Sequence, residues 1–583
     1  MVPLFVNKLI NIIHYRQVQW TKNTNSCLAS DINITFQVIF PAAVARQMRQ
    51  PRSSHPRAYL TGLPIPCTMA VIVRTGQHWT LPTVEGIEAM ADKAYLAIDM
   101  GASSGRHVVG LFDGRRIRLE EVYRFENGPV EADGRMYWDL LHLWTHVRQG
   151  LRAAASRFPG QIGSVGVDTW GVDFGLLGRN HEILGNPYHY RDARTNGMME
   201  RAFAIVPRTK IFEHSGLQFM QFNTLYQLLA MKLSNSPLLD AAESMLFMPD
   251  LFHWLLTGQQ CNEMTDSSTS QFYNPARGAW ATELLDQFSL PTHILGRITQ
   301  PGTNLGPLRK PVAAETGLAA NVVLPGSHDT ASAVMAVPAQ SRPGTRPDWC
   351  YISLGTWALM GIESPQPVIS PKVLELNFTN EGGVANTTRL LKNISGLWMV
   401  QECRRVWNQQ GRNWGWEDLN QLSAAARPLV SFINPDAGEF LAPENMPEAI
   451  RNFCQKTGQT VPADEGAVLR CALESLAMKF RQVLGMCEEL NGGRLETIHI
   501  VGGGTKNRQL CQAAANACGR RVVSGPVEAT ALGNVLMQAV SAGDVGSIAQ
   551  ARELIRNSFQ VEEYLPQDTA AWDAAYEKFQ AKQ

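Results

Sequence analysis

Two short stretches of similar pattern, one in each half of the chain, constrain the fold more than any other feature. Residues 94–112, AYLAIDMGASSGRHVVGLF, read as an apolar run, a turn of small residues and a second apolar run. Residues 349–362, WCYISLGTWALMGI, repeat that order. Apolar runs of this length around a glycine-containing turn predict β-hairpins. The repeat therefore predicts an α/β protein built from two units of common design.

The segments that follow each hairpin support the duplication. After the first we expect a strand at 117–125, a helix at 136–158 and two strands within 162–178. After the second we expect a strand and helix in 388–410, a long helix at 465–492, a strand–turn–helix at 495–519 and a strand–helix at 520–543. Residues 340–349, rich in Pro, Arg and Gly, are typical of a linker. A cleft between the two units is the expected ligand site.

Composition narrows the function. The formal net charge is zero and the pI is about 7.2, which favours neither nucleic acid nor an anionic membrane as a partner. The ten cysteines include no CxxC pair, so we interpret them as reduced thiols of a cytoplasmic enzyme. No apolar run reaches the roughly 18 to 20 residues that span a bilayer.

The beginning of the chain differs from the rest. Residues 1–84 hold one acidic residue, Asp31, and eight lysines or arginines, without a periodic apolar pattern. Such a segment is typical of a transit peptide or of a disordered basic arm, or it results from a start codon assigned upstream of the true one. We favour the last interpretation, with Met90 as the start, and expect residues 1–93 to be an unstructured extension outside the two units.

Three glycine-containing turns are candidates for phosphate or nucleotide binding. Residues 99–106, DMGASSGR, combine Asp99, two glycines, two serines and Arg106, which suit a phosphate and a Mg²⁺ ion. The alternative is an ordinary hairpin turn with a solvated arginine. Thr356 marks the counterpart turn, and residues 501–507, VGGGTKN, let a backbone lie against an adenosine or simply form a tight joint. Neither a Walker A loop nor a Rossmann fingerprint is present.

Residues 327–333, SHDTASA, place an imidazole and a carboxylate where a helix begins. Asp329 is either a helix cap or a proton acceptor, and the helix N-terminus should keep it ionised. The small residues after it admit a ligand or another backbone. Asp168 and Asp173 in DTWGVDF suggest a glycosidase pair, which we disfavour because phosphate-type turns would then have no use.

These motifs occur in one order that resembles the FGGY carbohydrate kinases. DMGASSGR, DTWGVDF, SHDTASAV, SLGTWALMG, LKNISGLW and GPVEATALGN carry the resemblance, which covers about residues 94 to 560. It implies an actin-like ATPase fold of two RNase H-like domains with a central cleft. Residues 94–342 would form the sugar and phosphate side, and residues 343–583 the nucleotide side.

The resemblance also implies an activity. TWGVDF, YRDARTNG and FNTLYQL favour ATP-dependent phosphorylation of the 1-hydroxyl of L-rhamnulose, in L-rhamnose degradation. The alternatives are the same chemistry on another ketose such as L-fuculose or xylulose, or an actin-like ATPase or sugar sensor. The expected partners are the sugar, ATP and Mg²⁺, and the expected state is a monomer or homodimer.

The resemblance assigns roles to individual residues. Asp329 would be the catalytic base, and the small residues after it would leave space for the sugar, which Gly171 and His328 would contact. The phosphate hairpin would comprise Ala102, Ser103, Ser104, Gly105 and Arg106, the other nucleotide contacts would be Thr356, Asn393, Gln401 and Gly503, and Asp99 would lie on the Mg²⁺ side.

Overall fold

The computed structural model describes residues 73–75, 78–80, 93–340, 346–441 and 443–582, and the chain divides into two units, Met1–Met90 and Ala91–Gln583. In the first unit, β1 (Val73–Thr75) and β2 (His78–Thr80) form an antiparallel pair. The rest of the predicted extension lies outside the described residues, except Lys93, with which β3 begins. So do residues 341–345 of the predicted linker, and the domain boundary placed there stays a prediction.

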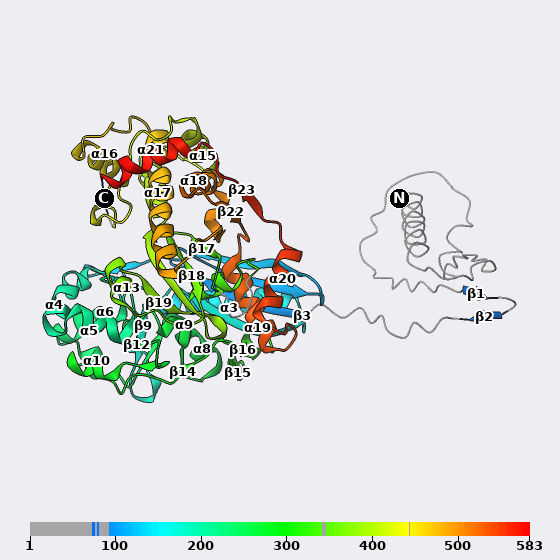
Figure 1. Cartoon of the computed structure of the whole chain (residues 1–583). Helices are drawn as coiled ribbons and strands as arrows, with labels where there is room; N and C mark the ends of the chain where they lie inside the picture. Colours follow the sequence, from blue (N-terminus) through cyan, green and yellow to red (C-terminus); the bar gives the residue numbers. More distant parts are fainter. Residues whose placement is uncertain (1–72, 76–77, 81–92, 341–345, 442, 583) are drawn as a thin grey trace. The chain divides into compact units, whose positions relative to one another are not determined.

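The first half of the second unit contains a six-stranded sheet with the order β15-β16-β8-β3-β4-β5. Figure 1 labels β3, β15 and β16 of this sheet. The predicted hairpin is present, β5 extends it in antiparallel fashion, and β8 and β16 continue the sheet in parallel to β3. The strands are β3 (Lys93–Met100), β4 (Ser104–Phe112), β5 (Ile117–Glu126), β8 (Ile162–Thr169), β15 (Asn304–Pro307) and β16 (Asn321–Val323).

The second half repeats this plan in a seven-stranded sheet with the order β19-β20-β18-β17-β21-β22-β23. Strands β17, β18 and β20 are antiparallel, β21 and β22 run parallel to β17, and β23 closes the edge as β15 does in the first sheet. The predicted duplicated α/β fold is confirmed. The strands are β17 (Trp349–Leu354), β18 (Trp357–Ser364), β19 (Thr379–Gly382), β20 (Thr388–Ser395), β21 (Thr497–Val501), β22 (Arg521–Ser524) and β23 (Glu562–Tyr564).

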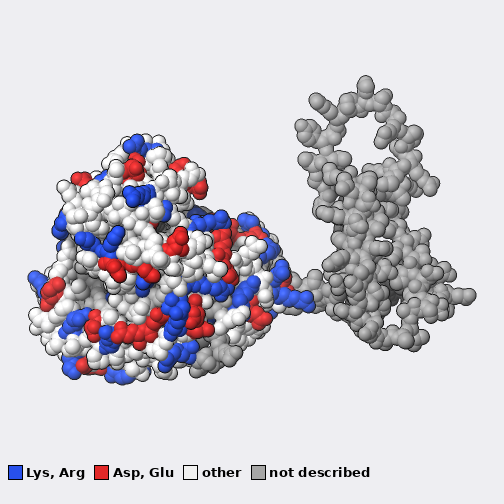
Figure 2. Space-filling view, turned by 45° about the horizontal axis from the view of Figure 1, so that its top comes forward, with Lys and Arg blue, Asp and Glu red and all other residues white. Residues whose placement is uncertain are grey.

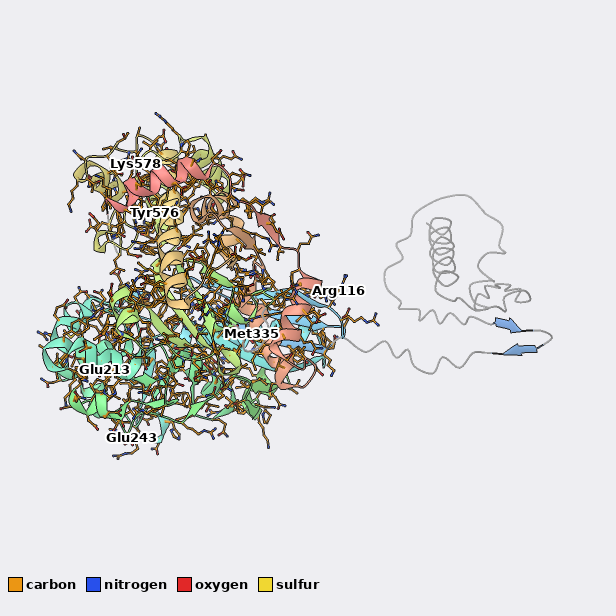
Figure 3. The ribbon with its side chains drawn as sticks, viewed as in Figure 1. Arg116, Glu213, Glu243, Met335, Tyr576 and Lys578 are labelled. Carbon is orange, nitrogen blue, oxygen red and sulfur yellow. The ribbon has the colours of Figure 1, made fainter. Side chains whose placement is uncertain are left out.

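Two helices lie between the sheets. α12 (Asp329–Met335) and α19 (Ala529–Ser541) pack against each other and against strands of the first sheet, and α12 also contacts β17. Alternate residues of β3 serve the two faces, since Tyr95 and Ala97 join the core between the sheets and Leu96 and Ile98 join the outer core. Met335, at the end of α12, lies in the interior, whereas Glu213 and Glu243 lie at the periphery (Figure 3).

The small residues after Asp329 allow α12 to pack closely against α19. A Cβ atom added to Gly533 of α19 would lie 1.9 Å from the carbonyl oxygen of Ser332 in α12. Ala331, Ser332 and Ala333 are buried against this second helix. They therefore admit a backbone, and the expectation that they leave space for the sugar is wrong.

Outer helices cover the far face of each sheet. α3 (Leu140–Arg157) and α8 (Met248–Thr257) pack on the first sheet, and α17 (Glu465–Asn491), with α18 (Arg508–Cys518) beside it, packs on the second. Many of the other elements lie between β9 and β16, in a helical region that the sequence did not predict.

The remaining elements are β6 (Val130–Ala132), β7 (Arg135–Tyr137), β9 (Phe174–Leu177), α4 (Met198–Ile205), α5 (Arg208–Ser215), α6 (Thr224–Leu233), α7 (Pro237–Asp240), β10 (Ser244–Phe247), β11 (Asn262–Glu263), α9 (Met264–Ser267), β12 (Tyr273–Asn274), β13 (Ala279–Trp280), α10 (Thr282–Gln287), β14 (Ile298–Thr299), α11 (Lys310–Thr316), α13 (Pro371–Leu376), α14 (Trp398–Gln409), α15 (Trp416–Ala425), α16 (Met446–Lys456), α20 (Ile548–Ser558) and α21 (Thr569–Gln580). Short 3₁₀ turns lie at Arg179–His181, Ala193–Thr195, Val384–Asn386, Gly438–Phe440 and Gly503–Lys506.

Surface charge is mixed. Figure 2 shows acidic and basic side chains interspersed over the face that it draws. Among the described helices, none has the length and apolar character needed to cross a membrane. The eight described cysteines are all buried and unpaired.

Candidate active site

A cavity of about 280 Å³ opens where the strand ends of the two sheets face each other. It brings together most of the residues that the sequence singled out. From the first half it is lined by Ala102, Ser103, Arg106, Gly171, His328 and Asp329, and from the second by Thr356, Asn393 and Gly503. Ser104, Gly105, Gln401 and Asp99 do not line it.

Two carboxylates stand at neighbouring strand ends beside this cavity. Asp99 and Asp168 are paired in register between the parallel strands β3 and β8. One oxygen of Asp168 accepts a hydrogen bond from Asn534 Nδ2 at 2.5 Å, and its other oxygen is buried without a partner. Burial, reinforced by the charge of Asp99, raises the pKa of Asp168 well above its usual value. An orphaned oxygen next to a second carboxylate suits a hard cation such as Mg²⁺.

Arg106 is not a free cation. Its Nε and Nη2 atoms donate to Asp99 Oδ2 at 2.9 and 2.7 Å, and its Nη1 atom contacts Glu528. The guanidinium still lines the cavity, but two carboxylates share its charge. The alternative of a solvated surface arginine is therefore wrong, and a bound anion would compete with Asp99 and Glu528 for this group.

The turn before α12 is fixed by its backbone. Thr169 N donates to Ser327 O at 2.9 Å, Ser327 N donates to Glu263 Oε2 at 3.3 Å, and His328 N donates to Thr265 Oγ1 at 3.1 Å. His328 is the N-cap residue of α12 and no side chain caps the helix. Asp329 is therefore not a cap, and its side chain, 31% exposed, is directed to the cavity.

The pKa of the Asp329 carboxyl is raised, although a position at a helix N-terminus should lower it. Burial raises it, nearby His328 opposes the rise and Asp99 adds to it, with a net rise above the usual value. The preference of the helix N-terminus for an ionised carboxylate is thus outweighed by burial and by the charge of Asp99. A carboxylate with a raised pKa is a better proton acceptor near neutral pH than an ordinary one.

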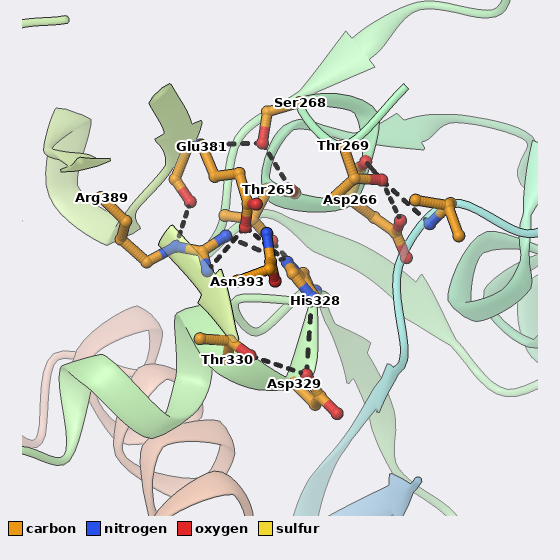
Figure 4. Close-up of polar contacts among 12 residues, drawn as sticks. Thr265, Asp266, Ser268, Thr269, His328, Asp329, Thr330, Glu381, Arg389 and Asn393 are labelled. Carbon is orange, nitrogen blue, oxygen red and sulfur yellow. Dashed lines mark hydrogen bonds and ion pairs between the residues drawn. The ribbon is translucent and has the colours of Figure 1, made fainter. Parts of the chain in front are cut away.

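His328 lies between Asp329 and a buried ion pair (Figure 4). Its Nε2 atom is 3.5 Å from Asp329 Oδ1, and its Nδ1 atom is 3.1 Å from Arg389 Nη2. Arg389 is fully buried, pairs with Glu381 at 3.1 Å and donates to Gly382 O at 2.8 Å. Sequence reasoning missed Glu381 and Arg389, which lie in the mixed strands TNEG and TRLLKNIS and carry no distinctive local signal.

A strained turn adjoins the predicted sugar contact. Val172 has a φ of 70°, which is rare for a β-branched residue, and its N–H donates to Thr269 Oγ1 at 2.9 Å. A Cβ atom added to the neighbouring Gly171 would lie 2.9 Å from the Thr269 side chain. Both residues line the cavity. No pattern in the sequence indicates the strain at Val172.

Asp173 is structural, which excludes the glycosidase alternative. It accepts hydrogen bonds from Trp138 Nε1 at 2.6 Å, Trp170 Nε1 at 3.0 Å, Tyr190 N at 3.2 Å and Gln227 Nε2 at 2.9 Å. Burial raises its pKa to about 6. A fully buried carboxylate with four donors cannot protonate a glycosidic oxygen in the cavity.

The second hairpin offers a neutral surface. Thr356 Oγ1 donates to Gln401 Oε1 at 3.2 Å, so Gln401 acts behind Thr356. Asn393 is tied to Gln218 through its backbone and side-chain nitrogens, at 2.9 and 3.1 Å. A Cβ atom on Gly503 would meet no described atom within 4 Å, whereas one on Gly504 would lie 2.2 Å from the Leu354 side chain. Gly503 is thus open to the cavity and Gly504 is a packing position.

Two α/β halves of common topology, facing each other across a cavity lined by carboxylates and glycine-rich turns, define the actin-like class of phosphate-handling proteins. The sequence profile of the FGGY carbohydrate kinase N-terminal domain matches residues 94–336, and that of the C-terminal domain matches residues 350–542. The chain belongs to the FGGY family of carbohydrate kinases.

Individual relatives agree with this placement. A protein of Bacteroides thetaiotaomicron named rhamnulokinase is 43% identical over 486 residues, which are 83% of this chain and 98% of the relative. A Bacillus subtilis rhamnulokinase is 37% identical over 475 residues, 81% of this chain and 96% of the relative.

Solved structures share the fold at low identity. A ligand-bound xylulose kinase from Lactobacillus acidophilus has a TM-score of 0.69 at 16% identity, covering 84% of this chain and 97% of its own. The Plasmodium falciparum glycerol kinase with ADP has a TM-score of 0.65 at 14% identity, covering 84% and 98%. These likenesses show the fold.

Proposed function

We propose that this chain transfers the γ-phosphoryl group of ATP to the 1-hydroxyl of L-rhamnulose. The observation that supports the chemistry most is the shared cavity, where Asp329, the first hairpin and Gly503 face one another. The name of the similar proteins supports the choice of sugar.

In the proposed transfer, Asp329 accepts the proton of the attacking hydroxyl as the sugar oxygen bonds to the γ-phosphorus. The bond to the β-phosphate oxygen breaks, and ADP leaves with the electron pair. The raised pKa of Asp329 suits this role. Gly171 and His328 bind the sugar, and the exclusion of water by the two halves limits ATP hydrolysis.

The backbone of the first hairpin and Arg106 bind the phosphates, and Thr356, Asn393 and Gly503 bind the rest of the nucleotide, with Gln401 behind Thr356. Asp99 and Asp168 fit a Mg²⁺ ion, which usually takes one or two carboxylates together with substrate phosphates. When bound, Mg²⁺ would neutralise charge on the phosphates. Asp99 would then leave Arg106 freer to meet an anion.

The test measures ADP release with MgATP and a panel of L-rhamnulose, L-fuculose, xylulose and glycerol. Turnover with L-rhamnulose above all others is expected. Turnover with a different sugar would change the substrate and keep the mechanism, whereas sugar-independent hydrolysis would contradict the proposal. A chain that begins at Met90 should match the full chain within about twofold, because the family match begins at residue 94.

A further inference from the structure

The buried pair of Arg389 and Glu381 has no part in the transfer as described above, yet it contacts the imidazole that faces the sugar space. Arg389 lies on β20 and Glu381 on β19, both in the second sheet, and His328 precedes α12 beside the first sheet. The arginine is 0% exposed and the glutamate 5%. Burial alone would raise the pKa of Glu381, but the charge of Arg389 opposes burial and the pKa is lowered overall, so this carboxylate is ionised.

The chemistry of the contact fixes which atom donates. A guanidinium carries only donors and does not lose its proton in proteins. Arg389 Nη2, 3.1 Å from His328 Nδ1, therefore donates, and Nδ1 accepts with its lone pair. In a neutral imidazole the other nitrogen then carries the proton. That nitrogen, Nε2, faces Asp329 and the cavity.

One competing arrangement exists. Glu381 Oε2 lies 3.4 Å from the same Nδ1 atom and could accept a proton from it, which would make the ring an imidazolium or the Nδ1–H tautomer. The Arg389 nitrogen is closer, and a proton on Nδ1 would oppose the N–H of Arg389. Glu381 is in turn paired with Arg389 Nη1 at 3.1 Å. The contacts therefore favour Nδ1 as an acceptor.

We propose that Arg389 and Glu381 are positioning residues that hold His328 as the neutral Nε2–H tautomer. Glu381 orients the guanidinium, and the guanidinium occupies Nδ1. His328 can then donate a hydrogen bond to a carbonyl or hydroxyl oxygen of the sugar, but it cannot take the sugar's proton. Asp329 remains as the proton acceptor. This inference rests on the proposed function for its link to sugar binding, although the tautomer itself does not.

The surroundings keep this pair in register. Gly382 N donates to Ser268 Oγ at 2.7 Å, at the C-terminal end of the short helix α9. Thr265, in the first turn of α9, accepts from His328 N. Both partners of the His328–Arg389 contact are therefore attached to one polar segment, residues 263–269, so the contact depends little on side-chain freedom alone.

The first experiment reads the tautomer without any substrate. The full chain is labelled with ¹⁵N-histidine, and His328→Gln identifies the His328 signals by difference. We expect a nonprotonated Nδ1 and a protonated Nε2 in the neutral ring at pH 8. The double variant Arg389→Met with Glu381→Gln removes both charges of the pair, and should yield a mixture of the two neutral tautomers.

The second experiment asks whether the pair acts through His328. The double variant should lower kcat/KM for the sugar at least about tenfold, with little change in the KM for ATP. In a His328→Gln background the same double change should cost less than about threefold, because the residue through which it acts is gone. Arg389→Lys should restore part of the loss, since an ammonium can still donate to Nδ1.

A matched control separates this role from packing. Buried Arg552 and partly buried Glu363 form another ion pair, with contacts of 2.9 and 3.0 Å, and neither lines the cavity. Arg552→Met with Glu363→Gln should change the free energy of unfolding. It should leave the His328 signals unchanged and the sugar kcat/KM within about threefold of the wild-type value.

Three results would overturn the inference: a protonated Nδ1 in the wild-type chain, an unchanged tautomer in the double variant, or equal losses with and without His328. Because the labelling experiment needs no turnover, it still decides the inference if the sugar panel contradicts the proposed function. A variant that does not fold is recognised by its circular dichroism, and the wild-type spectrum then decides.

Discussion

The two sheets share their strand order but not the chemistry at their strand ends. In the first, Asp99, Asp168 and Asp329 follow or end β3, β8 and β16, and Arg106 pairs with Asp99. In the second, the corresponding ends of β17 and β21 lead into Gly355, Thr356 and the glycines at 502–504. At these strand ends the first half of the cavity is therefore charged and the second is neutral, although Glu381 of β19 also lines the cavity.

The difference shows how a duplicated fold divides one reaction. Charged groups at the first sheet suit proton transfer and a cation, which act on the chemical step. Glycines at the second sheet leave room for the base and ribose of the nucleotide in the proposed reaction, so they affect nucleotide binding. Charge substitutions on the first side should therefore lower kcat, and volume substitutions on the second should raise a KM.

The largest expected effect comes from Asp329→Asn, which keeps the shape and removes the proton acceptor. We expect kcat to fall by at least about 10²-fold, with sugar and ATP binding retained. Rates from ADP release and binding from calorimetry provide the measurement. A variant with near-normal kcat would contradict the assignment of the proton acceptor to the first sheet.

Gly533→Ala tests the contact between the helices that join the two halves. A new Cβ atom 1.9 Å from Ser332 O should cost about 1 to 3 kcal/mol of unfolding free energy, measured by denaturant titration. The control is Gly485→Ala on the exposed face of α17, where a Cβ meets no described atom within 4 Å. It should be neutral or stabilising by about 0.5 to 1 kcal/mol, as alanine favours a helix. Equal stability of Gly533→Ala and wild type would restore the view that the small residues serve a ligand.

Gly503→Val tests the neutral side. The added side chain enters space that is open in the cavity, so we expect the KM for ATP to rise about tenfold while kcat stays within about threefold. Steady-state kinetics at saturating sugar measures both. A fall in kcat with an unchanged KM for ATP would contradict the division of roles.

These outcomes also show how far the sequence determines the site. Glycine turns, strand periodicity and SHDT predicted both hairpins and part of the cavity lining, because such signals are local, whereas Gly171 and Asn393 were expected only from the family resemblance. The Arg389–Glu381 pair and the strain at Val172 arise from contacts between distant segments, and no local pattern encodes them. For the same reason the contact of Arg106 with Glu528 was not predicted, since Glu528 belongs to the other half of the chain.

The smallest expected effect is a displaced pH profile. Base catalysis by Asp329 needs the ionised carboxylate, and burial with the charge of Asp99 raises its pKa above the ordinary value of about 3.9. Activity should therefore rise with pH, and its acid limb should lie above that value rather than at or below it. Asp99→Asn removes one cause of the rise, so it should move the limb of the residual activity to lower pH. A limb that stays in place, with kcat/KM measured from pH 4 to 8 at constant ionic strength, would show that the charge gathered at the first sheet does not act on the proton acceptor. The contrast between the two sheets would then concern binding alone.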